Sequence, residues 1–294
     1  MSRTPQDIYA SNLLHGQRFG YPLRDPKPND KFDLEGFRIG DVGYIDDYGE
    51  FNWAFHISSL PKEFLESGIQ NLPLDQPAGK RAFNAGTVFK AGVKQVLEQP
   101  TRARRYPHIP YRRIKVLHGI QRAEYAFTMT SNEGAILILP DGASRFELRD
   151  KKQLEDIREY VVRYALQWCR FTRQDTLYLI TAAFKSKSWT LGSFYDGSHG
   201  DKILVHQYFD SSGSDMTGSS SYRWECESNI DNPVSPRNNP YLNQTVLLKG
   251  FKVTVRWDWL PIVERAEGAE WWLVCFLSSL WSTILWRWLS QIGA

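Results

Sequence analysis

Cysteine is scarce in this chain, and Cys169, Cys226 and Cys275 lie far apart. Metal sites need ligands at short spacings, and a secreted disulfide framework usually has an even number of cysteines. The first residues also lack the apolar core of a signal peptide. We therefore expect no metal ligands, no disulfide framework, and a body that resides in a reducing, cytoplasmic compartment.

Motifs of common catalytic chemistry are missing as well. None of the six histidines lies four residues from another or near a cysteine, and no Gly-x-Ser-x-Gly elbow occurs. The segment between Gly86 and Gly92 lacks the Gly-Lys-Ser/Thr ending of a phosphate-binding loop. We predict no catalytic residue and no cofactor, which favours a protein that is not an enzyme.

Neither charge sign dominates, because 36 basic and 33 acidic residues leave a net charge of +3. The basic residues are nevertheless concentrated between Glu98 and Glu124, where seven occur without an acid. This stretch can neutralise the phosphates of anionic lipids or, less favoured, of nucleic acid. Alternatively, it is an exposed loop whose charges pair with the acidic segment 27–66. The candidate anionic-surface contacts are Arg102, Arg104, Arg105, Arg112, Arg113 and Lys115.

Four acids between residues 41 and 50 are the best candidates for an enzyme site. Two carboxylates in one cleft could perform acid–base chemistry in a hydrolase-like enzyme or bind a hard cation. The structural alternative is that Asp46 and Asp47 form a solvated turn while Asp41 bonds backbone amides at a bulge. We favour this alternative because the acids lack the alternation of a calcium loop.

The sequence is rich in strand patterns and poor in helices. Strands are predicted at 37–45 and 51–57 as one hairpin, and at 124–130 and 135–139 as a second hairpin. Further strands are expected at 114–120, 176–184, 189–195, 203–209, 222–226 and 245–257, and loops with a short strand or two at 58–110. Asp150 is a good N-cap for an amphipathic helix over about 151–170.

These patterns predict an α+β protein with a mainly antiparallel, sandwich-like body, one inserted amphipathic helix and a C-terminal apolar helix. Residues 1–35 are rich in proline and charge, and we expect an irregular arm with a short helix around 7–14. Residues 36–260 would form a single globular body, and residues 261–294 a linker and a Trp-rich helix.

Several phrases resemble an uncharacterised protein family of mushroom-forming (agaricomycete) fungi. They are RIGDVGYI at 38–45, GAILILPDGASRFELRD at 134–150, WCRF at 168–171, LYLITAAFKSKSW at 177–189 and NQTVLLKGFKV at 243–253. The resemblance covers roughly residues 15–260 and implies no particular activity or catalytic residue. It does not extend to the C-terminal apolar segment.

Residues 271–294 contain five of the 11 tryptophans. The segment 271–277 is apolar on every side, whereas the remainder has an apolar stripe opposite Ser, Thr, Gln and Arg287. The candidate membrane or partner contacts are Trp271, Trp272, Leu277, Trp281, Ile284, Trp288 and Ile292.

Three environments suit this C-terminal helix. Its 22 residues from 271 to 292 are about 33 Å long, enough for a bilayer, but Arg287 and the polar residues disfavour a span. It can instead lie in the plane of a membrane, or dock on a protein groove. We expect a binding or effector module attached to a membrane or protein partner and able to self-associate. Its localisation would be cytoplasmic, peripheral to a membrane or tail-anchored in one.

Overall fold

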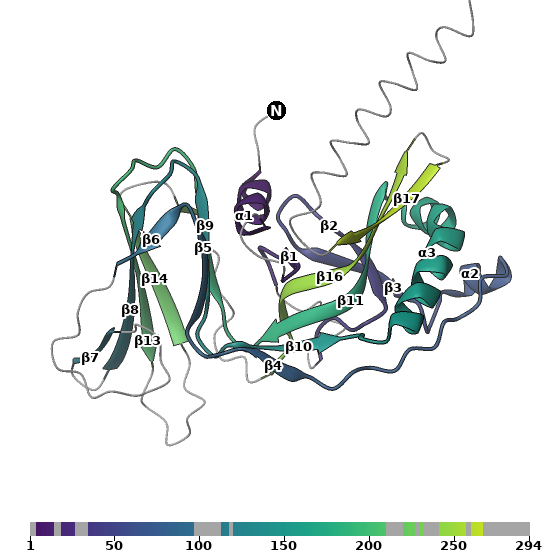
Figure 1. Cartoon of the computed structure of the whole chain (residues 1–294), viewed down its shortest axis with the longest axis horizontal. Helices are drawn as coiled ribbons and strands as arrows, with labels where there is room; N and C mark the ends of the chain where they lie inside the picture. Colours follow the sequence, from purple (N-terminus) through teal and green to yellow (C-terminus); the bar gives the residue numbers. More distant parts are fainter. Residues whose placement is uncertain are drawn as a thin grey trace, which may run out of the picture.

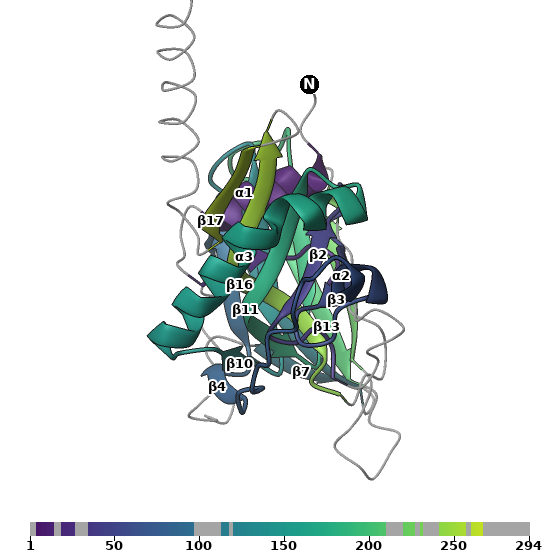
Figure 2. The same ribbon diagram turned by 90° about the vertical axis from the view of Figure 1, so that its right-hand side faces the viewer.

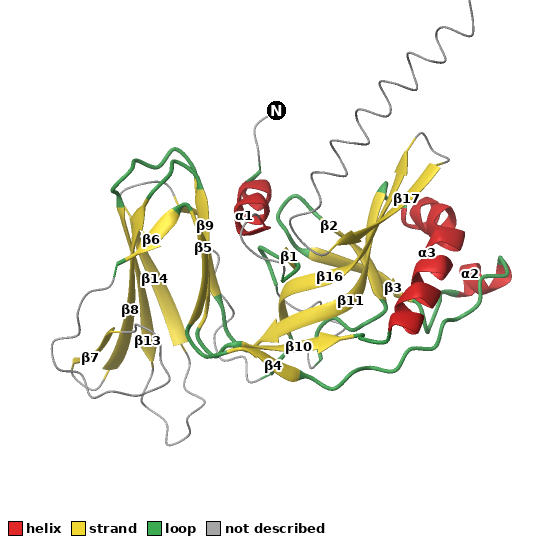
Figure 3. Cartoon of the chain, in the orientation of Figure 1, coloured by secondary structure: helices red, strands yellow, loops and turns green. Residues whose placement is uncertain are grey.

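The computed structural model describes residues 4–14, 19–26, 35–96, 113–117, 120–209, 220–226, 230–231, 241–256 and 260–266. Within these ranges the strands form three antiparallel sheets, and three helices accompany them (Figure 3). The protein is therefore an α+β protein dominated by antiparallel strands, as its sequence predicts. The helices are α1 (Pro5–Leu14), α2 (Lys62–Glu66) and α3 (Lys151–Thr172).

The large sheet has eight strands around the long central strand β11. One edge of β11 pairs with β16, and the other pairs with β10 and β2. All but the first residue of β11 are buried, which explains its nearly continuous apolar run. The strands of the large sheet are β1 (Tyr21–Pro22), β2 (Asp41–Ile45), β3 (Phe51–His56), β4 (Lys80–Phe83), β10 (Ala143–Glu147), β11 (Thr176–Ser186), β16 (Gln244–Arg256) and β17 (Leu260–Ala266).

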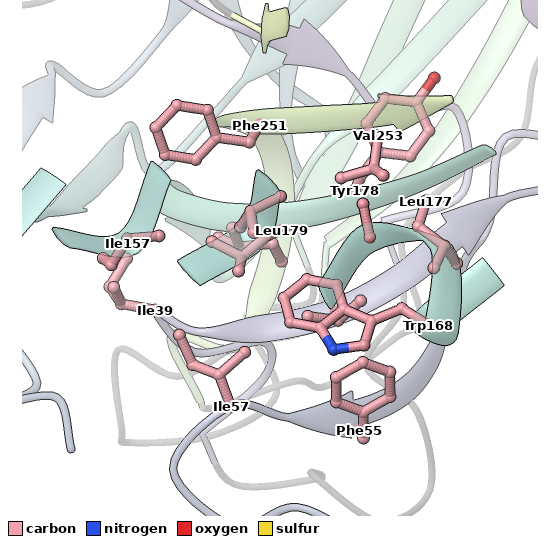
Figure 4. Close-up of a cluster of buried hydrophobic side chains, with 14 of the residues drawn as sticks. Ile39, Phe55, Ile57, Ile157, Trp168, Leu177, Tyr178, Leu179, Phe251 and Val253 are labelled. Atoms are coloured by element: carbon pink, nitrogen blue, oxygen red, sulfur yellow. The ribbon is translucent and has the colours of Figure 1, made fainter. Parts of the chain in front are cut away.

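Helix α3 covers one face of the large sheet (Figure 2). It begins after Asp150, whose side chain accepts a hydrogen bond from the Lys152 amide, and it ends at Arg173 in the left-handed conformation. Its apolar stripe is buried, and Trp168 packs edge-to-face on Phe55 of β3 at 5.3 Å between ring centroids. Figure 4 shows this core between α3 and the strands. The predicted helix at 151–170 is thus confirmed.

The other two sheets pack face to face as a sandwich (Figure 1). Side chains from both sheets fill the space between them, including Phe127 and Val205 from one and Ile136 and Ile138 from the other. The inner sheet consists of β5 (Thr87–Ala91), β9 (Gly134–Leu139), β12 (Thr190–Phe194) and β15 (Ile230–Asp231). The outer sheet consists of β6 (Val93–Gln95), β7 (Arg113–Leu117), β8 (Ile120–Met129), β13 (Lys202–Phe209) and β14 (Ser220–Cys226).

Helix α1 lies between the sandwich and the large sheet (Figure 1). Its Tyr9 and Leu13 share one buried cluster with Leu137 of the inner sheet and with Phe184 and Leu247 of the large sheet. The helix therefore joins the two β structures through side-chain packing. The segment predicted as an irregular arm contributes this helix and also β1, which pairs with β16.

The predicted second hairpin, between 124–130 and 135–139, is wrong. The turn at 131–133 does join β8 to β9, but β8 pairs with β6, β7 and β13, whereas β9 pairs with β5 and β12. The two strands face each other across the sandwich core. Their short connection is an arch between two sheets.

The structure also has more strands than the one or two short ones expected at 58–110, and it has strands in two segments where none was expected. Residues 58–96 contain three strands and α2, and β10 precedes α3 in a segment for which no strand was predicted. Strand β17 occupies the start of the segment predicted as a linker and pairs with Gly250–Arg256 of β16. The first hairpin is confirmed, although its first strand begins at Asp41 instead of Phe37.

Candidate functional site

Asp41, the first residue of β2, is a fully buried carboxyl group in the acidic hairpin. Its Oδ2 accepts a hydrogen bond of 2.6 Å from the Arg38 amide, and its Oδ1 accepts one of 3.1 Å from Trp53 Nε1. The Arg38 guanidinium lies 4.0 Å from Oδ1. Burial raises the pKa of Asp41, while these donors and the nearby His56 act in the opposite direction. Both oxygens thus serve the local fold.

The remaining acids of the hairpin form its turn. Asp46 Oδ1 accepts hydrogen bonds of 3.0 Å from the amides of Tyr48 and Glu50, and Asp47 is exposed. Gly49 closes the turn with a φ of +83°, and a Cβ there would meet the Gln6 side chain. Asp46 therefore forms the turn that was predicted from the sequence as the alternative to a site of paired carboxylates.

His56, at the end of β3, is held by two hydrogen bonds. The Ser58 amide donates to Nδ1 at 3.0 Å, and Nε2 lies 2.9 Å from the carbonyl oxygen of Ile39. Because Nδ1 accepts a backbone proton, the hydrogen-bond pattern assigns the ring proton to Nε2, which donates to Ile39. Both ring nitrogens are therefore used, and the ring is fixed in this arrangement.

Lys185 of β11 is a buried lysine for which its sequence context predicted no role. Its Nζ donates to the carbonyl oxygen of Glu35 and lies 4.7 Å from the ring centroid of Phe146. Burial lowers the pKa of Lys185 to about 8, although the charges of Asp41 and Glu35 raise it. The available signal was a lysine directly after the apolar run 177–184, on a strand that is buried on both faces.

We call Asp41, His56 and Lys185 the polar cluster. Their hydrogen bonds link the segment before β2 to the rest of the large sheet. Lysines with a lowered pKa can act as nucleophiles. Here, however, the amine is already bonded to a backbone carbonyl and packed on a ring. Cys169 of α3 is similarly unsuited to attack, because burial raises the pKa of its thiol to about 11.

A cavity of about 350 Å³ lies where α3 begins. Three of its six charged residues pair within the wall: Glu147 Oε2 is 3.4 Å from Arg145 Nε and 3.2 Å from Arg149 Nε. The lining therefore has no dominant sign, and its size suits a small polar ligand. Its polar lining consists of Asp75, Lys80, Arg145, Glu147, Arg149, Asp150 and Gln153.

The structure brings part of the predicted basic stretch onto the outer sheet. Arg113 and Lys115 belong to β7, where they pair in register with Glu124 and Arg122 of β8. The remaining predicted contacts, Arg102, Arg104, Arg105 and Arg112, lie outside the described residues.

All predicted C-terminal contacts lie outside the described ranges as well. They are Trp271, Trp272, Leu277, Trp281, Ile284, Trp288 and Ile292. Among the helices that the structure does describe, none has the length and apolar character needed to cross a bilayer.

No family model and no curated protein matches this sequence. The resemblance to the agaricomycete family therefore stays a prediction.

Proposed function

We propose that this chain is a binding or effector module that attaches to a membrane through its C-terminal segment 271–292. The observation that carries the proposal is the composition of this segment, a uniformly apolar start followed by an apolar stripe rich in tryptophan. Such a helix gains free energy by placing its stripe at the boundary between headgroups and acyl chains.

The large sheet would lie close to that membrane. Strand β17 pairs with β16 up to Ala266, opposite Gly250. Five residue steps separate Ala266 from Trp271, and an extended chain of this length spans at most about 18 Å. An inserted segment would consequently hold the body near the bilayer surface.

The bonding of the polar cluster supports a binding role over a catalytic one. For a hydrolase-like reaction at the acidic hairpin, Asp41 would have to give up its bonds to the Arg38 amide and to Trp53 Nε1. His56 would have to release a backbone donor from Nδ1. Each of these changes leaves a buried polar group of the large sheet with one bond fewer.

Flotation with neutral and anionic liposomes tests the attachment. The full chain is expected to float, and a chain ending at Ala266 is expected to remain unbound. The cut belongs after Ala266 because an earlier one would remove part of β17. Flotation of the shortened chain to the same extent as the full chain would contradict the proposal.

A matched pair of full-length variants removes the need to truncate. Trp288 lies on the apolar stripe, whereas Trp286 lies on the polar side. We expect Trp288→Ser to weaken flotation much more than Trp286→Ser. If instead the full chain stays unbound and truncation lowers its thermal stability, the segment docks on the body and the membrane proposal fails.

A further inference from the structure

The cavity at the start of α3 lies where two paired strands separate. The described pairing of β4 with β10 ends at Lys80 and Arg145. In the same register, Ala78 and Glu147 would face each other next, but both line the cavity and no backbone hydrogen bond joins them. Figure 1 shows the chain from α2 approaching β4 while β10 leads on toward α3. The cavity therefore takes the place of a strand contact.

The backbone of Glu147 presents a donor and an acceptor to this cavity. The Leu148 amide donates to the carbonyl oxygen of Thr181 in β11 at 3.0 Å, so the backbone groups of Leu148 point toward β11. Backbone direction alternates along an antiparallel strand, and the N–H and C=O of Glu147 consequently point the other way. They are placed to bond an extended chain by strand addition.

Three basic side chains surround this open position. Arg145 and Arg149 both contact Glu147 Oε2 through Nε, at 3.4 and 3.2 Å. Their terminal nitrogens form no further bond with the residues that the structure describes. Lys80 is exposed and lies opposite Arg145 in the ladder, so the two side chains share a face. Such guanidinium forks bind a carboxylate through two parallel hydrogen bonds.

The remaining acids of the cavity differ in how they are used. The Asp150 side chain already accepts a hydrogen bond from the Lys152 amide. Asp75 is exposed and forms no ion pair with any described residue. Between Asp75 and the basic group, Pro77 and Leu148 supply an apolar lining. A ligand here meets a positive charge toward Lys80, a negative charge at Asp75, and an apolar wall with backbone hydrogen-bonding groups in between.

We propose that the cavity binds a short peptide with free termini, extended beside Glu147. The peptide carboxylate meets Lys80 and the two arginine forks, and its ammonium group meets Asp75. A residue between the termini exchanges hydrogen bonds with the N–H and C=O of Glu147. In this orientation the peptide runs antiparallel to β10, as β4 does. A cavity of about 350 Å³ is near the lower end for ligand sites and limits the peptide to a few residues.

The charge of the lining favours a ligand that carries both signs. Three acids and three bases line the cavity, and only one of the acids lies between the arginines. A ligand with a single negative group would leave Asp75 without a partner, whereas a zwitterion satisfies both ends. A free amino acid has both charges, but it lacks the peptide group that the backbone of Glu147 can bond.

Titration calorimetry of the full chain with trialanine tests the site through changes in the ligand alone. Amidation of the carboxyl terminus should weaken binding at least about tenfold, because bonds to charged donors are lost. Methylation of the middle amide nitrogen should weaken it about fivefold, because the donor to the Glu147 carbonyl oxygen is lost. No binding of trialanine, or equal affinity for the amidated peptide, would overturn the proposal.

Acetylated trialanine represents the carboxyl end of a longer chain. It lacks the ammonium group that faces Asp75, so it should bind more weakly than trialanine, by up to about fivefold. Tighter binding of the acetylated peptide would mean that the ligand is a protein terminus, and the assignment to a short free peptide would fail.

A matched pair of arginine variants locates the binding. Arg149 and Arg158 have side chains that are 54% and 52% exposed, and each contacts a glutamate, but only Arg149 lines the cavity. Arg149→Gln should weaken trialanine binding about tenfold, whereas Arg158→Gln should change it less than about twofold. Equal effects of the two variants would overturn the assignment to this cavity. Liposome flotation reports on segment 271–292 separately, so either proposal can fail alone.

Discussion

The large sheet and the outer sheet differ in how their two faces are used. One face of the large sheet packs on α3, and the other packs on α1 together with the inner sheet. The outer sheet seals the sandwich core with one face and exposes charged residues such as Lys94 and Lys202 on the other. Figure 1 shows the outer sheet at the end of the molecule away from α3.

This difference shows that the large sheet mainly supports the core, whereas the outer sheet also provides a surface. A sheet covered on both faces needs apolar residues at successive positions, as in β11. A sheet covered on one face alternates, as β8 does from Glu124 to Met129. Its outward positions are then available for contacts with other molecules.

The largest expected effect comes from the α3 side of the large sheet. Trp168→Ala should lower the free energy of unfolding by about 4 kcal/mol, because it leaves a cavity in the core. The matched change on the same helix is Phe171→Ala, at a side chain that is 43% exposed. Urea unfolding of both variants measures the difference. Equal losses in the free energy of unfolding would show that the buried face of α3 is no more important to the core than its exposed face.

The next largest effect concerns α1, which packs between the inner sheet and the large sheet. Leu13→Ala should cost about 3 kcal/mol, since Leu13 is buried between the inner sheet and the large sheet. Hydrogen exchange should show weakened protection in both β9 and β16. The exposed Leu65→Ala serves as control. Loss of protection in only one of the two strands would mean that α1 belongs to a single sheet.

The smallest effect is a pH dependence of the large sheet. Burial lowers the pKa of Lys185 to about 8 from 10.5, so the folded chain binds this proton less well than the unfolded chain. Between these two values, stability due to this group rises with pH, and below pH 8 its penalty is constant. Relative to Lys185→Met, the wild type should gain about 1 kcal/mol between pH 8 and pH 9.

Denaturant unfolding at the two pH values checks this, with the exposed Lys187→Met as control. The control should follow the wild type. Parallel profiles for the wild type and Lys185→Met would show that folding does not lower the pKa of the Lys185 amine.

The elements themselves were largely predictable, whereas their partners were not. Helix α3 carries its own start signal at Asp150 and a clear apolar stripe, and both are local properties of the sequence. Pairing is not local. The turn at 131–133 indicated a hairpin, but a turn of the same length can also arch between two facing sheets.

The sequence of β9 held a clue to its position. Its residues Ile136 and Ile138 face the outer sheet, while Leu137 and Leu139 face α1. A run that is apolar at every position therefore indicates a strand that is covered on both faces. A strand of a simple hairpin with one solvent-exposed face would alternate between apolar and polar residues.

Short or charged strands escaped prediction for a different reason. Strand β17 contains Pro261, Glu264 and Arg265, a composition typical of a linker. Proline is tolerated there because β17 is an edge strand whose described pairing is with β16 alone. Only the presence of β16 makes the segment a strand, and propensity cannot supply that information.

The candidate sites were predictable to different degrees. The turn role of Asp46 follows from its position before Gly49, so the sequence could favour it. The contact of Lys185 with Glu35 joins residues that are 150 positions apart, and nothing near either residue indicates it.

The position of α1 has a consequence for the order in which the chain folds. Tyr9 and Leu13 share a buried cluster with Val246 and Leu247, which come much later in the chain. During synthesis that cluster cannot close until β16 has left the ribosome. Contacts of such sequence separation form slowly because a long loop must close first. We expect α1 to dock late, so a nascent chain exposes the apolar face of β9 until β16 has been synthesised.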